Sequence, residues 1–532
     1  MGVADEPYQR YCPGEEHIHI SDAVCLGRRR ANFEKCPGCQ FNDDERGERP
    51  FVASLVGARS RRGPVIDERE EQMIDRVFKA YDVRATVPDL LNEETAWRIG
   101  NATAQFLRTV LTGYDRSDVE MSKLIVGRDT RTHSPMLCDA FIEGASATGT
   151  PVVDIGLIDT SQIYFAVNHL KCCGGVVTTA SHNPPNYNGF KICGPKGKPI
   201  GQDTGLQEIQ RIAKAIARHK VDPLDSVQRR DLAEPYRDFL RGFLRPPRPL
   251  RIVVDASNGS AGRWFPIVFA DIPGLTVHAL NMEHDGEFAH PPNPLVEANL
   301  AQMKAAVRGM DADFGACFDG DADRCVLVDE NAETVPCDLL TALLAEEYLR
   351  DAPGAAVVYD LRSSRIVKER IEACGGVAVR ERVGHVFMKR AMAERGGVVG
   401  GELSGHFYFR DFFNCDSGML ALIAVCNILT RAGRGPGLSG LIRPLRVYRQ
   451  SGERNFRNDD KDAALRLLAE RFADAQIDHL DGITAQYDDW WFNVRPSNTE
   501  SLLRLNLEAA GPGLLAARLA ELTPLLGEPV EH

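Results

Sequence analysis

The sequence lacks any hydrophobic run long enough to cross a membrane. Its most apolar stretch, Gly418–Leu429, holds about 12 residues, whereas a spanning helix needs about 20, so a buried helix is the better interpretation. The opening segment MGVADEPYQRYC carries acidic side chains and no apolar core of a secretory signal. Together these absences predict a protein that works in the cytoplasm without a membrane partner.

An excess of positive charge is also missing. The chain has 63 Lys and Arg residues against 75 Asp and Glu residues, which gives a net charge of −12. This balance argues against nucleic acid as the partner of the whole chain. It also means that an acidic ligand such as a phosphate ester needs arginines and lysines concentrated at its binding site.

Paired cysteines of a disulfide framework are absent from most of the chain. The 14 cysteines stand mostly alone among apolar or mixed neighbours. In a chain of 532 residues this pattern is typical of a reducing compartment. The N-terminal cysteines, considered below, are the exception.

From about residue 73 onward, short apolar β-branched runs alternate with helical patterns, which predicts α/β units with largely parallel sheets. We expect three mixed α/β domains around a central cleft, a C-terminal α+β domain and a small Cys-rich N-terminal module. The predicted boundaries are 1–72, 73–228, 229–333, 334–445 and 446–532. Predicted strands are Leu124–Val126, Pro151–Ile155, Gly175–Thr179, Arg251–Asp255, Phe314–Phe318, Cys325–Val328, Ala356–Asp360, Val377–Val379, Gly397–Val399 and Leu502–Leu507, and predicted helices include Ser134–Thr148, Leu206–Ala217 and Asp338–Leu349.

The first motif that carries chemistry is TTASHNPP, residues Thr178–Pro185, directly after an apolar strand. The Asn-Pro-Pro sequence disfavours helix and holds an exposed loop. Ser181, presented at the end of a buried strand, is a candidate nucleophile. A polar turn with a capping serine remains the alternative, because the neighbouring His182 is not placed on the hydroxyl by adjacency alone.

The second motif is DGDADR, with Asp319, Asp321 and Asp323 at alternate positions. Three carboxylates so spaced repel one another unless a hard cation such as Mg²⁺ lies among them. A Ca²⁺ EF-hand would also use these positions and Glu330, but it requires glycine where this chain has Arg324. We therefore predict a Mg²⁺ loop, with a solvated acidic turn as the alternative.

Two further loops combine turn residues with polar side chains. In GGELSGH, Glu402 and Ser404 offer groups that hydrogen-bond sugar hydroxyls. In RPSNTE, Arg495 stands beside Ser497, Asn498 and Thr499, a set of donors suited to phosphate. Each loop alone is also consistent with an ordinary turn. In this order on one α/β chain, the four motifs indicate phosphoryl transfer on a phosphorylated sugar.

The four motifs resemble those of the α-D-phosphohexomutase superfamily, in which each of four domains carries one loop, and the resemblance covers residues 73–532. It implies that Ser181 carries the transferable phosphoryl group and that Mg²⁺ binds Asp319, Asp321, Asp323 and a phosphoserine oxygen. Phe78–Arg84, Gly127–Arg131 and Arg382–His385 resemble further family segments. The resemblance also implies that Tyr81 and Arg84 lie near the substrate and that Glu402 and Ser404 bind sugar hydroxyls. The non-reacting phosphate would be bound by Arg495, Ser497, Asn498 and Thr499.

Proton transfer is assigned by the same resemblance to Lys191 or His385, with Arg324 nearby. The chain departs from the family at Arg362, where a lysine is frequent. Arginine keeps the charge but does not release its proton, so Arg362 is a substrate-binding residue rather than a base.

The implied activity moves a phosphoryl group between O1 and O6 of mannose or glucose through a hexose 1,6-bisphosphate, which also acts as activator. Leu403 favours the phosphomannomutase/phosphoglucomutase branch, because the phosphoglucosamine branch usually has Gln there. A phosphoglucosamine mutase, a non-catalytic partner-binding protein on this scaffold and a phosphatase remain alternatives.

The N-terminal module holds four cysteines, Cys12, Cys25, Cys36 and Cys39, the last two in a CPGC pair. We predict a Zn²⁺ site, with an iron–sulfur cluster or free thiols as alternatives. The basic run Arg28–Arg30 leaves a protein or nucleic-acid partner open, although a solvated face is the simpler interpretation.

Overall fold

The computed structural model describes residues 9–12, 15–21, 68–110, 120–219, 227–245, 248–433, 435–497 and 501–530. Only the backbone is described for 9–12 and 15–21, which form the antiparallel strands β1 (Gln9–Cys12) and β2 (Glu15–Ser21). Most of the N-terminal module, including Cys25, Cys36 and Cys39, lies outside the described residues, as do Asn498 and Thr499. None of the helices described is long and apolar enough to pass through a bilayer.

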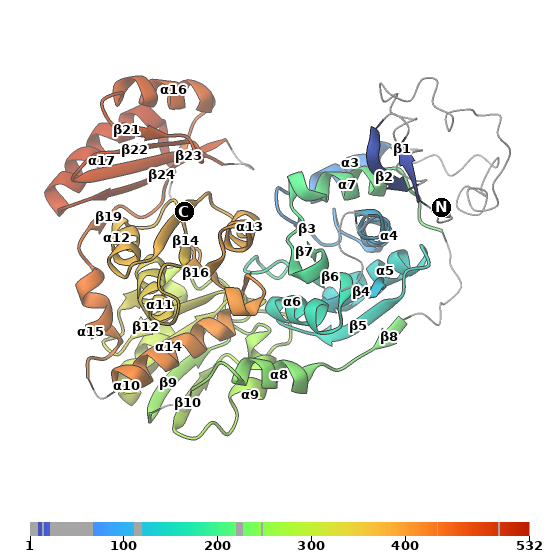
Figure 1. Ribbon diagram of the computed structural model, residues 1–532, viewed down its shortest axis with the longest axis horizontal. Helices are drawn as coiled ribbons and strands as arrows, with labels where there is room; N and C mark the ends of the chain where they lie inside the picture. The colour runs from blue at the N-terminus through green and yellow to red at the C-terminus, as the bar shows by residue number, and fades with distance from the viewer. Residues whose placement is uncertain are drawn as a thin grey trace.

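Domain I is built on a six-stranded sheet in the order β3-β7-β6-β4-β5-β8 (Figure 1). Its strands are β3 (Val83–Thr86), β4 (Glu120–Arg128), β5 (Val152–Leu157), β6 (Cys172–Thr178), β7 (Tyr187–Cys193) and β8 (Val227–Arg229). Its helices are α3 (Glu68–Val77), α4 (Glu93–Val110), α5 (Ser134–Ser146), α6 (Thr160–His169) and α7 (Leu206–Lys214).

Domains II and III each contain a five-stranded sheet, β10-β9-β11-β12-β13 and β15-β14-β16-β17-β18. Domain II comprises α8 (Ala233–Arg241), β9 (Leu250–Asp255), α9 (Ala261–Phe269), β10 (Leu275–Leu280), α10 (Ala301–Met310), β11 (Phe314–Phe318), β12 (Cys325–Asp329) and β13 (Thr334–Val335). Domain III comprises α11 (Cys337–Asp351), β14 (Ala356–Asp360), α12 (Arg365–Ala373), β15 (Val377–Glu381), α13 (His385–Arg395), β16 (Gly397–Gly401), β17 (Phe407–Phe409), β18 (Cys415–Asp416), α14 (Gly418–Ala432) and α15 (Leu438–Ile442).

Domain IV differs in having an antiparallel sheet in the order β21-β22-β23-β24-β20-β25, with β19 also paired to β24. Its elements are β19 (Arg449–Gln450), β20 (Arg454–Arg457), α16 (Lys461–Arg471), β21 (Gln476–Asp478), β22 (Ile483–Gln486), β23 (Trp490–Pro496), β24 (Leu502–Ala509), α17 (Pro512–Leu526) and β25 (Glu528–Val530). In Figure 1 this domain stands apart from domain I, on the other side of a gap above domain III.

The predicted strands and helices are confirmed to within a few residues, and Gly418–Leu429 lies in the buried helix α14. The expectation of largely parallel sheets is only partly right. Strands joined through helices are parallel, for example β4 with β6 and β9 with β11. The pairs β6–β7 and β11–β12 are antiparallel, because a short loop can join only antiparallel neighbours.

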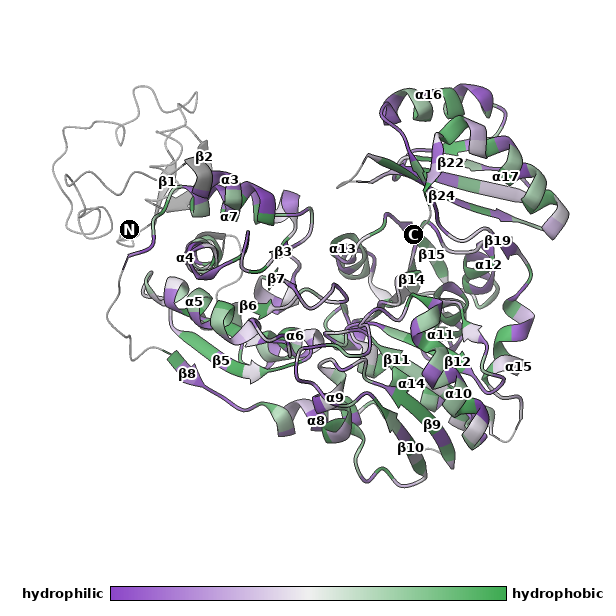
Figure 2. Ribbon diagram, turned by 180° about the vertical axis from the view of Figure 1, so that it is seen from behind, coloured by the Kyte–Doolittle hydropathy of each residue, from purple (hydrophilic) through white to green (hydrophobic). Residues whose placement is uncertain are grey.

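The hydrophobic residues follow the strands and the inner faces of the helices (Figure 2). One continuous core contains buried residues from all of domains I to III, from Ile125 to Leu445, and a second core fills the other side of domain I. Domain IV has a core of its own, from Phe456 to Leu526, with no member in common with the others. Domains I to III therefore form one packed body, and polar contacts that connect domain IV to it include those of Arg365 with Tyr487, Asp488 and Glu508.

Candidate active site

Ser181 lies in the loop between β6 and β7, at the carboxyl edge of the domain I sheet. Its backbone has a φ of 53°, a left-handed conformation that is uncommon for residues other than glycine. The residue is buried, and its backbone N–H donates to Thr179 Oγ1 at 2.9 Å. The turn thus presents the serine side chain toward domain II instead of continuing the strand.

Arg131 holds this loop from beneath. Its guanidinium donates to the backbone carbonyl oxygens of Ser181, Asn183, Pro184 and Tyr187 at 2.7–3.1 Å. The arginine is fully buried, paired with the equally buried Asp129 at 3.2 Å, and its guanidinium lies 4.8 Å from the centre of the Phe288 ring. One side chain therefore fixes three carbonyl groups of the nucleophile loop and that of Tyr187, where β7 begins.

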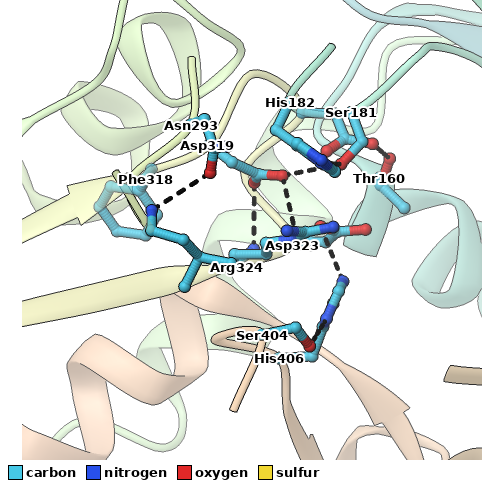
Figure 3. Close-up of polar contacts among 12 residues, drawn as sticks. Thr160, Ser181, His182, Asn293, Phe318, Asp319, Asp323, Arg324, Ser404 and His406 are labelled. Atoms are coloured by element: carbon cyan, nitrogen blue, oxygen red, sulfur yellow. Dashed lines mark hydrogen bonds and ion pairs between the residues drawn. The ribbon is translucent and has the colours of Figure 1, made fainter. Parts of the chain in front are cut away.

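The acidic motif forms the loop of the β11–β12 hairpin in domain II and lies against the Ser181 loop (Figure 3). Ser181 Oγ donates a hydrogen bond to Asp319 Oδ2 at 2.8 Å. Gly320 permits this approach, since a Cβ at this position would lie 2.5 Å from the Ser181 carbonyl oxygen. The serine and the carboxylates, far apart in the sequence, are thus in direct contact.

The three carboxylates are buried and their oxygens gather within 4.8 Å of one another. Asp321 Oδ2 accepts hydrogen bonds from Thr160 Oγ1 at 2.6 Å, Thr179 Oγ1 at 3.2 Å and Lys191 Nζ at 2.7 Å. Asp321 Oδ1 and Asp323 Oδ1 are buried and accept no hydrogen bond, although His406 Nε2 lies 3.4 Å from Asp323 Oδ1. Because buried carboxylate oxygens need a partner, and hard cations prefer such oxygens, this cluster fits a metal ion.

Lys191 reaches the same carboxylates from β7, where it pairs with Val177 of β6. Its Nζ lies 2.7 Å from Asp321 Oδ2 and 2.5 Å from Asp323 Oδ2. Burial alone would lower the pKa of Lys191, but the charges of Asp321 and Asp323 outweigh it and raise the pKa. Lys191 is therefore a protonated side chain in this arrangement.

Two histidines of the site are held neutral instead. Burial, with the charge of Lys389, lowers the pKa of His385 well below its usual value. The charge of Arg324, with burial, does the same to the pKa of His182, whose Nδ1 lies 3.3 Å from Ser181 Oγ. Arg324 itself donates its backbone N–H to Asp319 Oδ1 at 3.1 Å. A neutral imidazole can accept a proton, and a protonated amine cannot.

Domain III contributes the GGELSGH loop after β16. Glu402 is buried, accepts the Gly384 N–H at 2.9 Å and accepts the Tyr408 hydroxyl at 2.5 Å. Ser404 Oγ lies 2.9 Å from His406 Nδ1, and the other ring nitrogen of His406 lies 3.4 Å from Asp323. The sugar loop therefore lies next to the acidic cluster, as Figure 3 shows for Ser404 and His406.

Two residues of domain I that were predicted to lie near the substrate are Tyr81 and Arg84. The Tyr81 hydroxyl lies 3.5 Å from the Val383 carbonyl oxygen of domain III. Burial, with the charge of Asp481 in domain IV, raises the pKa of Tyr81. Arg84 pairs with Asp82 and donates to Asn183 Oδ1 at 2.7 Å, beside the nucleophile loop. Tyr81 thus lies where domain III meets domain I, and Arg84 lies beside the nucleophile loop.

Arg362 and Arg495 lie on facing sides of the seam between domains III and IV. Arg362 Nη2 donates to Asp360 Oδ2 at 2.8 Å, and Asp360 also accepts the Leu403 N–H at 2.8 Å, which links this arginine to the sugar loop. Arg495 Nη2 donates to Glu453 Oε2 at 2.8 Å. Ser497, at the end of β23, is buried.

Several residues of this site escaped the sequence analysis. Thr160 begins α6 and bonds an aspartate 161 positions away, and its only signal was the polar run Asp159–Gln162 after an apolar strand. Arg131 belongs to Gly127–Arg131, a segment that resembles the family but whose role its sequence does not disclose. Tyr408 and Glu453 gave no signal, because their importance comes from neighbours in other segments.

Comparison with known proteins identifies all four domains. The phosphoglucomutase/phosphomannomutase family models for α/β/α domains I, II and III match residues 75–220, 234–332 and 336–445, and the model for the C-terminal domain matches 453–523. A protein of Xanthomonas campestris named "Phosphohexose mutases" is 38% identical over 456 residues, covering 84% of this chain and 98% of the relative. An Escherichia coli phosphomannomutase is 38% identical over 464 residues, with the same coverage.

Solved structures of similar proteins belong to the same family. A phosphoglucomutase/phosphomannomutase family protein from Burkholderia thailandensis superposes with a TM-score of 0.75 at 31% identity, covering 85% of this chain and 99% of that one. These matches and the four loops described above establish that the chain belongs to the phosphoglucomutase/phosphomannomutase family.

Proposed function

We propose that this protein moves a phosphoryl group between O1 and O6 of a hexose phosphate through a phosphoserine at position 181 and a hexose 1,6-bisphosphate. Membership of the family makes the chain a phosphohexomutase, that is, an intramolecular phosphotransferase. The observation that carries the detailed proposal is the 2.8 Å contact between Ser181 Oγ and Asp319, where a serine from one domain meets three carboxylates from another.

The residues divide the work by their chemistry. Asp319, Asp321 and Asp323 would hold Mg²⁺, which when bound neutralises charge on the phosphoryl group. Lys191 and Arg324 place fixed positive charge beside Ser181, and the loop held by Arg131 keeps the hydroxyl oriented. The buried position of Ser181 keeps water away from the phosphoserine.

The proton of the accepting sugar hydroxyl needs a neutral acceptor. We propose Lys191 or His385 for this role; Lys191 contacts Asp321 and Asp323, the carboxylates that would hold the metal, so its protonation depends on the bound ion. Glu402 and Ser404 are proposed to hold the O3 and O4 hydroxyls of the sugar, which leaves either epimer at C2 acceptable.

The other phosphate is proposed to lie at the seam between domains III and IV, on Arg362, Arg495, Ser497, Asn498 and Thr499, with Tyr81 and Arg84 closing the domain I side. Domain IV has its own core, so it can move against the rest while the bisphosphate turns end over end. We propose domain boundaries close to residues 72, 228, 333 and 445, of which the first moves to before α3 at Glu68, the second to after β8 at Arg229 and the third to after β13 at Val335.

A substrate panel tests the assignment. With Mg²⁺ and a catalytic trace of the matching bisphosphate, we expect mannose 1-phosphate and glucose 1-phosphate to be converted to their 6-phosphates, and glucosamine 1-phosphate to react at least about tenfold more slowly, about 1.4 kcal/mol in the barrier. Chelation by EDTA should abolish turnover, and added Mg²⁺ should restore it. Preferred conversion of glucosamine 1-phosphate would assign the chain to the phosphoglucosamine branch, and release of inorganic phosphate would indicate a phosphatase.

A Zn²⁺ site in the N-terminal module remains a proposal from the sequence, with Cys12, Cys25, Cys36 and Cys39 as ligands. We expect the purified full-length protein to contain about one zinc per chain by elemental analysis, and Cys36→Ser to lose it. Cys374→Ser, at the one cysteine of residues 68–530 that is not buried, serves as the control and should keep the metal. Protein prepared without chelator that contains neither zinc nor iron would contradict the proposal.

A further inference from the structure

The carboxylate of Glu453 forms ion pairs with arginines at the seam between domains III and IV. Glu453, directly before β20, has Oε2 2.8 Å from Arg495 Nη2 and 3.6 Å from Arg362 Nη1. Its other oxygen lies 3.4 Å from Arg504 Nη1. Arg362 belongs to domain III and the other two arginines to domain IV, so one side chain connects the two domains electrostatically.

The position of Glu453 places it at the ligand site and not on an outer surface. It lines a cavity of about 330 Å³ together with Arg362, Leu403 and Ser404 of the sugar loop. Its side chain is only 25% exposed. Burial would raise the pKa of Glu453, but the charges of Arg495 and Arg362 outweigh it and lower the pKa to about 2. Glu453 is therefore ionised at any pH at which the protein works.

A carboxylate and a phosphate bind a guanidinium in the same way, through N–H groups that point at two oxygens. Arg362 already gives Nε and Nη2 to Asp360. Arg495 has Glu453 as its ion-pair partner, and its Nε is buried without a hydrogen bond. A phosphate that approaches Arg495 consequently meets a negative charge that is already in place.

We propose that Glu453 is a positioning residue that competes with the ligand phosphate for Arg495. The inference rests on the proposed function, since it takes Arg495 as a phosphate ligand. Without ligand the carboxylate keeps the arginines of two domains in place and offsets their mutual repulsion. When the ligand binds, Glu453 gives up Arg495 to the phosphate. The carboxylate then repels that phosphate, which speeds the release that a turning bisphosphate requires.

Glu453→Gln isolates the charge, because the amide oxygen still accepts from Arg495 while the negative charge is lost. We expect inorganic phosphate, measured by calorimetry in buffer without Mg²⁺, to bind roughly tenfold more tightly to E453Q than to the unaltered protein. Glucose 6-phosphate should show the same shift, with KM and kcat both lowered because release becomes slower. The matched control is Glu521→Gln, which removes a carboxylate from Arg471 and Arg518 on the outer side of domain IV.

The double variant E453Q/R495M assigns the effect to this site, because the gain in phosphate affinity should disappear in it. Unchanged or weaker phosphate binding by folded E453Q would overturn the proposal, as would an equal gain in E521Q. If E453Q does not fold, Glu453→Asp, which withdraws the charge from Arg495, should shift the affinity in the same direction by less. Phosphate binding needs no turnover, so a protein that responds as expected but has no mutase activity would refute the proposed function and leave this competition intact.

Discussion

Replacing Ser181 by alanine is expected to lower kcat by roughly 10⁴-fold or more, because the oxygen that accepts the phosphoryl group is removed. Ser181 Oγ lies 2.8 Å from Asp319 Oδ2. Another hydroxyl could replace it only by reaching the same carboxylate. Thr179 and Thr160 already donate to Asp321. Steady-state turnover of glucose 1-phosphate, with the bisphosphate supplied in trace, measures the loss.

The control for this variant is Ser161→Ala, which removes another buried hydroxyl of domain I, one without a hydrogen bond in the described structure. It should retain turnover and a phosphoryl group detectable by intact mass, which S181A should lack. Turnover of S181A within a factor of ten of the unaltered protein would exclude the phosphoserine mechanism.

The largest effect on stability is expected for Arg131→Met. This change leaves Asp129 buried without its ion-pair partner and frees three carbonyl groups of the Ser181 loop and that of Tyr187 in β7. Breaking a buried ion pair on one side costs about 3–5 kcal/mol, and the loss of the loop geometry should also reduce kcat. Thermal unfolding of the protein measures the loss of stability, and hydrogen exchange of the backbone amides in 178–190 measures the loss of loop order.

Arg229→Met provides the comparison, since Arg229 pairs with Asp154 at 3.7 Å while its side chain is 88% exposed. An exposed pair contributes about 0–1 kcal/mol, so this variant should unfold close to the unaltered protein. An R131M protein that unfolds like R229M would show that the buried arginine is not what holds the nucleophile loop.

The sequence was informative wherever a function is concentrated in a short segment. The loops around Ser181, Asp319, Glu402 and Arg495 each combine turn residues with reactive side chains, and each follows or precedes a strand that its β-branched residues indicate. Thr160, Arg131 and Glu453 bond partners that are distant in the sequence, so the local patterns around them do not disclose their roles.

Lys191 illustrates the intermediate case. Resemblance selected the residue, but the neighbouring residues do not disclose its state, because that state depends on two carboxylates from another domain. The antiparallel pairing of β7 with β6 brings it there, and a sequence that suggested parallel sheets gave little reason to expect this pairing. The charge of a buried group is thus decided by tertiary contacts.

The separate core of domain IV has a consequence for how this protein loses its structure. Domains whose hydrophobic cores have no member in common are not obliged to melt together, so cooperativity should extend over the three α/β domains as one unit and over domain IV as another. A calorimetric scan of the chain is then a superposition of transitions, and a single midpoint would describe neither unit. Ligands that bridge the two units would reveal themselves by drawing the transitions together.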